Sequence, residues 1–151
     1  MLTQTRIRRE DDFSSLLLNS TSTRTPLLTF WTASYSNASE TISPLLQELI
    51  NSGVGEEEGG VNFAEVEYDA PDVQDSGIGM DYMITSMPTL LSFDRGEAMT
   101  GTKVTDPKLM TDREYMKEWI RTEAKRKGDG GAGANAGGGL FGGLFGMFRK
   151  S

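Results

Sequence analysis

The sequence predicts an α/β domain with a central mixed sheet of four or five strands flanked by helices. Two patterns indicate this class. Short apolar or alternating runs typical of strands recur along the chain, and between them lie segments whose apolar residues repeat at helical spacing. The 151 residues correspond to about one domain. The expected order of elements is β-α-β-α-β-(α)-β-β-α, in which the bracketed helix is short.

The first elements are a strand, a helix and a second strand. Residues 3–9 are expected to form a short polar strand, and Asp11 or Asp12 is expected to cap the helix that follows. Residues 27–31 are densely apolar, which is typical of a strand buried on both of its faces. This second strand is therefore predicted to lie at the centre of the sheet.

The middle of the chain contains the clearest amphipathic helix. Apolar residues recur at i, i+3, i+4, i+7 and i+8 over residues 42–50. Pro44 lies inside this pattern, so we expect a kink or a late effective start. Residues 61–68 form the next expected strand. Residues 70–83 form a short helix at best, because two glycines weaken it.

A hairpin and a helix complete the expected domain. Residues 89–93 and 98–104 are predicted to be antiparallel strands joined by a turn at residues 94–97. The spacing from Thr111 to Glu114 fits a capping box that opens the last helix.

Composition excludes several classes of function. The formal net charge of −7 argues against duplex nucleic acid or an anionic membrane as the partner of the main body. The chain has no cysteine and no histidine, so we expect neither a disulfide nor a metal site, and we expect no cofactor. No stretch approaches the ~20 apolar residues of a membrane-spanning helix. No signal or transit pattern is present, and a cytoplasmic location is therefore expected.

The composition changes sharply after Gly128. Residues 128–139 are almost entirely Gly, Ala, Asn and Asp, which is typical of a flexible linker. We therefore divide the chain into a domain of residues 1–127 and a disordered, Gly-rich tail of residues 128–151. The large apolar side chains of the tail are candidates for docking on a partner or on the domain itself. They are Leu140, Phe141, Leu144, Phe145 and Phe148.

Two further interpretations of the tail stay open. Residues 139–146 form two Gly-Leu-Phe-Gly units, which resemble the repeats of some nucleoporins. The same segment resembles glycine-rich membrane-inserting peptides, and Arg149 and Lys150 would suit a lipid surface. Membrane contact by the tail is expected to be weak, because stable attachment generally needs a second signal.

Two segments resemble known motifs in a matching order. The first runs from Phe30 and Trp31 through Ser36 and Ser39 to the helix around Pro44. It is similar to the strand, active-site turn and kinked helix of thioredoxins, with one residue inserted before the first serine. The second segment, Met87-Pro88 followed by residues 89–97, is similar to the cis-proline segment and closing hairpin of that family. The resemblance covers residues 3–125 and implies a thioredoxin fold.

Three departures from the thioredoxin pattern decide the expected chemistry. Ser36 and Ser39 occupy the two cysteine positions, and Asn37-Ala38 replaces the intervening Gly-Pro. Thr29 stands where the family has a buried aspartate. A disulfide exchange needs a thiolate that attacks sulfur, and a serine hydroxyl cannot do so. We therefore expect a redox-inactive protein that is not an enzyme. The simplest role of the turn is to cap the helix, with Asn37 as the cap.

The resemblance also implies a binding groove. Thioredoxins pair an extended peptide with the main chain that precedes the cis proline, which is a known mode of peptide recognition. In this sequence Trp31, Tyr35, Met87 and Pro88 are expected to border that groove. The principal hypothesis is a protein-interaction or peptide-binding module that uses the groove, the tail or both. The alternative hypotheses are a purely structural Pro88 and a cysteine-independent, glutathione-binding or transferase-type enzyme.

Overall fold

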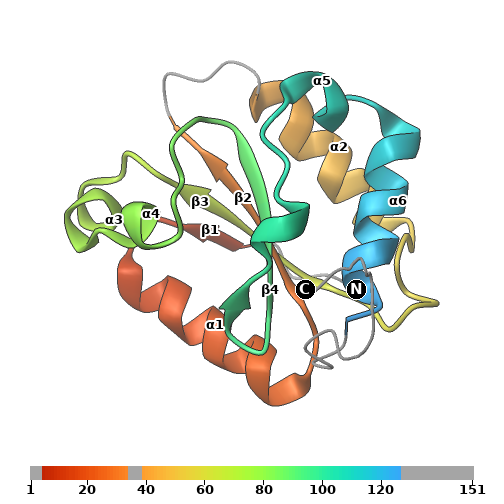
Figure 1. Ribbon diagram of the computed structural model, residues 1–151, viewed down its shortest axis with the longest axis horizontal. Helices are drawn as coiled ribbons and strands as arrows, with labels where there is room; N and C mark the ends of the chain where they lie inside the picture. The colour runs from red at the N-terminus through yellow and green to blue at the C-terminus, as the bar shows by residue number, and fades with distance from the viewer. Residues whose placement is uncertain (1–4, 34–38, 127–151) are drawn as a thin grey trace.

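The computed structural model describes residues 5–33 and 39–126, and their core is a five-stranded mixed sheet (Figure 1). The strand order is β1-β3-β2-β4-β5. The first three strands are mutually parallel, and β4 runs antiparallel to both β2 and β5. The strands are β1 (Thr5–Ile7), β2 (Leu27–Thr32), β3 (Asn62–Glu67), β4 (Thr89–Asp94) and β5 (Glu97–Ala98). The predicted mixed sheet is confirmed.

Helices cover both faces of this sheet (Figure 1). One face packs against α1 (Glu10–Thr23), α3 (Pro71–Ser76) and α4 (Ile78–Asp81). The other face packs against α2 (Ser39–Asn51), α5 (Pro107–Met110) and α6 (Arg113–Ala124). A short 3-10 helix, η1 (Thr100–Thr102), lies between β5 and α5. The predicted tail, residues 128–151, lies outside the described residues, as do Tyr35 and Ser36.

The strand β2 is central and divides its side chains between two cores. Leu28 and Phe30 pack with α2 and α6, whereas Leu27 and Trp31 pack with α1 and α3. All six residues of β2 are buried, because neighbouring strands flank it and helices cover both its faces. This confirms the strand buried on both faces that the dense apolar run predicts.

The start of α1 differs from the prediction. The main-chain N–H of Glu10 donates to Oδ2 of Asp72 at 2.8 Å, across 62 positions of sequence. Neither Asp11 nor Asp12 caps this helix, since both lie inside its first turn. The carboxylate that satisfies the helix N-terminus therefore comes from α3, which only the folded chain brings near.

The start of the last helix also differs from the prediction. The side chain of Asp112 accepts from the N–H of Tyr115 at 3.1 Å and caps α6. Thr111, the expected cap, instead ends the short helix α5. Asp106 caps α5, and Pro107 occupies its first position, where the missing N–H of proline has no consequence.

The partner strand of the hairpin is shorter than the predicted strand of residues 98–104. Beyond β5, the N–H of Met99 still donates to the carbonyl of Ser92 at 2.8 Å. The chain then turns through η1 and pairs with β4 again only where Val104 lies opposite Leu90. This detour places η1 beside α6, where Thr102 accepts a hydrogen bond from Trp119.

Candidate functional site

The segment before β4 lies at the end of the central strand β2. The last pair of the β2–β4 ladder joins Trp31 to Thr89, so Pro88 and Met87 lie just beyond it. The peptide bond between Met87 and Pro88 is cis. Pro88 is buried, whereas Met87 is half-buried and packs against the α1-side core. The chain therefore places this dipeptide where β2 ends.

The main chain of Met87 is open. No hydrogen bond within the described residues uses its N–H or its C=O. The preceding carbonyl, that of Ser86, accepts from the hydroxyl of Thr89 at 2.7 Å, which fixes the turn into β4. Unpaired main-chain groups beside a sheet can pair with another extended segment.

Trp31 does not border this groove, contrary to the prediction. Its side chain has no exposed surface, because the alternation of β2 directs it into the core under α1. The ring contacts Phe13 with a centroid distance of 5.8 Å. Its indole Nε1–H donates to the hydroxyl of Thr29 at 2.8 Å. Trp31 therefore stabilises the fold and has no surface to offer a ligand.

Thr29 has a neutral hydroxyl at the position that, by resemblance, is a buried aspartate in thioredoxins. Its hydroxyl donates to the carbonyl of Leu91 at 2.6 Å and accepts from Trp31. Both hydrogen bonds are buried. A threonine hydroxyl has no titratable proton near neutral pH, so this position cannot act as the proton acceptor that an aspartate would provide.

The other residues predicted for the turn are only partly described. Ser39 is the first residue of α2, and nothing is described of its side chain. Tyr35 and Ser36 lie outside the described residues. The structure therefore brings Met87 and Pro88 to the end of β2 but does not show how the two serines lie relative to them.

Sequence reasoning missed two exposed methionines near this dipeptide. Met80, within α4, is 80% exposed, and Met83, in the connection that leads from α4 to Pro88, is 62% exposed. With Met87 they are spaced by three and four residues, a signal that was available in the sequence. Methionine side chains are flexible and polarisable, and they adapt to varied partners.

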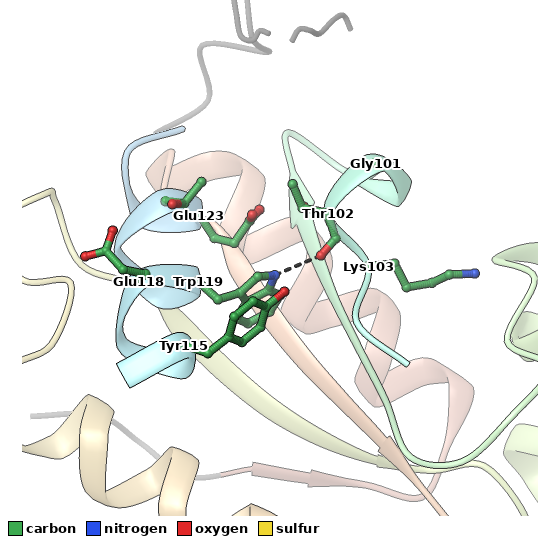
Figure 2. A pocket seen from close by; sticks show the side chains of 8 residues that line it. Gly101, Thr102, Lys103, Tyr115, Glu118, Trp119 and Glu123 are labelled. Atoms are coloured by element: carbon green, nitrogen blue, oxygen red, sulfur yellow. Dashed lines mark hydrogen bonds between the residues drawn. The ribbon is translucent and has the colours of Figure 1, made fainter. Parts of the chain in front are cut away.

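A pocket of about 340 Å³ lies between η1 and α6 (Figure 2), and the sequence analysis did not predict it. Trp119 forms one wall, and its indole Nε1–H donates to the main-chain carbonyl of Thr102 at 2.8 Å. Tyr115 lies beside Trp119 on the same helix (Figure 2). This hydrogen bond joins α6 to η1 at the pocket.

A buried carboxylate also lines the pocket. Glu123 has no exposed surface, and its Oε1 accepts from the hydroxyl of Ser92 and from Nε of Arg126. Its Oε2 is buried without a hydrogen-bond partner. The pKa of Tyr115 is raised above its ordinary value, mainly because its side chain is partly buried and also because Glu123 is negatively charged. The sequence held a signal for this residue, since Glu123 continues the inward spacing of Met116, Trp119 and Ile120.

The described residues contain no group of three or more His, Asp or Glu side chains able to hold a metal ion. Over the same ranges, no helix is long and apolar enough to cross a membrane. The chemistry that these residues offer is hydrogen bonding, at the open main chain of Met87 and at the buried carboxylate of Glu123.

Solved thioredoxins are similar to this chain in fold. Thioredoxin NaTrxh from Nicotiana alata matches with a TM-score of 0.63 at 11% identity, covering 82% of this chain and 94% of that one. The thioredoxin of Malassezia sympodialis matches with a TM-score of 0.62 at 18% identity, covering 82% and 93%. Oxidised thioredoxin O2 from Arabidopsis thaliana matches with a TM-score of 0.55 at 21% identity, covering 72% and 89%.

The chain therefore has a thioredoxin fold, as the sequence predicts. No protein-family model matches the chain, and no curated protein matches it significantly. The 151 residues contain no cysteine, so they lack the thiols on which the redox chemistry of thioredoxins depends. The protein is thioredoxin-like in structure without that chemistry.

Proposed function

We propose that this protein is a non-catalytic, thioredoxin-like module that binds an extended peptide at the main chain of Met87. The observation that supports this proposal is the open N–H and C=O of Met87 at the end of the central strand. An extended peptide that pairs with these groups gains main-chain hydrogen bonds, and side-chain contacts then provide specificity.

The surroundings of Met87 favour a peptide with apolar side chains. Met80, in α4, and Met83, in the connection that follows α4, are exposed, and they would contact the side chains of a bound segment. A methionine surface can repack around different residues. The net charge of −7 favours neutral or basic peptides over acidic ones, because it repels negative charge.

The test is peptide selection on the intact chain. A phage-displayed library of short random peptides is selected against the intact chain, and the affinities of the selected peptides are measured by isothermal titration calorimetry. We expect Met87→Glu and Met83→Glu each to weaken binding by about tenfold or more, equivalent to about 1.4 kcal/mol. The matched control is Leu18→Glu, since Leu18 is 69% exposed on α1 and lies outside the proposed site. Circular dichroism verifies that each variant folds.

Two results would contradict the proposal. One is a selection that yields no peptide above background, and the other is equal loss of affinity in the Leu18→Glu variant. A titration with glutathione separates this function from the transferase-type alternative. Saturable glutathione binding that Met87→Glu leaves unchanged would favour the alternative.

A further inference from the structure

Two buried carboxylates of this chain differ in how their oxygens are satisfied. Glu65 accepts from the hydroxyl of Ser43 at 2.7 Å with Oε1 and from Arg6 at 3.0 Å with Oε2. Glu123 uses only Oε1, and its buried Oε2 has no partner. An unpaired buried polar atom is costly. The Oε2 of Glu123 therefore indicates a hydrogen-bond donor that belongs in the pocket between η1 and α6.

The walls of this pocket favour a cation on an apolar arm. Trp119 and Tyr115 contribute aromatic rings to the pocket lining (Figure 2). The carboxylate of Glu118 points away from these rings and pairs with Arg121 at 3.1 Å, so Glu123 supplies the acceptor beside them. The ammonium of Lys103 extends away from these rings (Figure 2) and lies 3.4 Å from the carbonyl of Met83. Aromatic rings and carboxylates together stabilise a guanidinium, which stacks on rings and donates in a planar fork.

The end of the described chain lies at the rim of this pocket. Arg126 is the last described residue, and its Nη2 lies 3.4 Å from the hydroxyl of Thr102, which lines the pocket. The sequence between Arg126 and Arg149 is rich in glycine, and a flexible linker of that length and composition would have a root-mean-square reach of about 25 Å. A tethered group at that range has an effective concentration near the millimolar level.

The charge and composition of the tail match the pocket. Asp129 is the single acidic residue after position 127, against Arg149 and Lys150, so the tail has a formal charge of +1. Residues 1–127 carry a formal charge of −8, which together with the +1 of the tail gives the net charge of −7. Phe148 precedes Arg149 directly, so an aromatic ring and a guanidinium occur together.

We propose that the pocket between η1 and α6 is the docking site of this chain's own C-terminus, with Arg149 donating to Oε2 of Glu123. The ring of Phe148 then packs against the aromatic wall of Trp119 and Tyr115. This interaction is intramolecular and does not depend on the peptide groove at Met87. It supplies the hydrogen-bond donor that Glu123 lacks.

The absence of cysteine makes the test direct. A Ser151→Cys variant takes one nitroxide label at the end of the otherwise intact chain, and the indole N–H signals of the two tryptophans are recorded by ¹⁵N NMR. We expect the signal of Trp119 to lose most of its intensity relative to the reduced label. We expect Trp31 to keep its intensity, because it lies in the core on the other side of the sheet.

Matched variants separate docking from chance encounters. Arg149→Gln should restore the Trp119 signal, and it leaves the domain unchanged because Arg149 lies in the tail. Glu123→Gln should also restore it, whereas Glu65→Gln should not. If a Glu123 variant fails to fold, the Arg149→Gln comparison still decides the question.

Two results would overturn the proposal. One is equal broadening of Trp31 and Trp119, or no broadening of either. The other is broadening of Trp119 in ¹⁵N chains that carry no nitroxide when they are mixed with nitroxide-labelled ¹⁴N chains, since this would make the docked segment that of a second copy.

Discussion

The two tryptophans show how differently the two sides of the sheet are built. On the α1 side, Trp31 is fully buried and donates to Thr29, which also lies within the core. On the α6 side, Trp119 donates to the main chain of η1 and forms the wall of a pocket that contains an incompletely paired Glu123. On the first side both hydrogen bonds of Thr29 lie within the core, and on the second side a buried carboxylate oxygen has no hydrogen-bond partner.

The two sides of the sheet also differ in the buried polar group that each contains. The position where thioredoxins have a buried acid is held here by Thr29, whose hydroxyl has both a donor and an acceptor. The buried acid with an unpaired oxygen is instead Glu123, on the last helix. Thr29 therefore has a structural role in the α1-side core, and the ligand-directed roles that we propose belong to the main chain of Met87 and to the pocket.

The largest expected effect on the free energy of unfolding comes from truncating Trp31 in the α1-side core. Trp31→Ala should lower the free energy of unfolding by about 3–5 kcal/mol, the usual range for truncating a large buried aromatic residue. The ring contacts Phe13 and is fully enclosed, so little relaxation can fill the space. Trp119→Ala should cost less, because Trp119 lines the pocket and is 6% exposed, whereas Trp31 has no exposed surface.

Urea unfolding followed by circular dichroism measures both variants without relying on tryptophan fluorescence. Equal losses for Trp31→Ala and Trp119→Ala would contradict the proposed difference between the two sides. A larger loss for Trp119→Ala would reverse it.

Two glycines, one on each side of the sheet, allow the same comparison with smaller expected changes in stability. A Cβ at Gly79, in α4 on the α1 side, would lie 2.2 Å from Cε1 of Tyr68. Gly79→Ala should therefore destabilise the protein by about 1–3 kcal/mol through overpacking. A Cβ at Gly101, at the pocket, meets nothing within 4 Å, and Gly101→Ala should change stability by about 0.5 kcal/mol or less.

Thermal and urea unfolding of the two alanine variants provide the measurement. Because both substitutions add one methyl group to a glycine, their difference reports the space around each position. Equal destabilisation of the two variants would show that the rigid contact between Gly79 and Tyr68 relaxes at little cost.

The sequence predicted the sheet and its helices because their signals are local. The buried strand at residues 27–31 and the amphipathic helix over residues 42–50 follow from the spacing of apolar residues alone. The capping of α1 by Asp72 could not be predicted, because the two helices lie far apart in sequence. Caps supplied across the fold leave no short-range pattern.

The candidate sites also include one feature that a local sequence motif predicted and others that only the folded chain reveals. The Met87–Pro88 segment was predicted from a local motif, and the structure places it at the end of β2. The orientation of Trp31 was predicted wrongly, because a resemblance to a motif does not specify which core receives a side chain. The pocket needs Thr102 of η1 and Glu123 of α6 to meet, and Ser92 of β4 donates to Glu123 from the core. Only the inward spacing of Glu123 indicated this arrangement in the sequence.

The smallest expected effect concerns the titration of Tyr115. Its pKa is raised above the ordinary value of 10.0, first by burial and then by the charge of Glu123. Glu123→Gln removes the second cause only, so the pKa of Tyr115 should fall but stay above 10.0. Tyr82 is the control, because its pKa is raised by burial, Asp81 and Glu10, none of which this substitution changes.

The sign of the accompanying stability change follows from the direction of the pKa shift. Because the pKa of Tyr115 is higher in the folded state, the unfolded chain loses this proton first as the pH rises. Its contribution to stability is therefore complete below about pH 10 and declines as the pH rises through the folded pKa. Carbon NMR titration of labelled tyrosines follows both rings. An unchanged Tyr115 beside an unchanged Tyr82 would show that the charge of Glu123 does not reach the aromatic wall of the pocket.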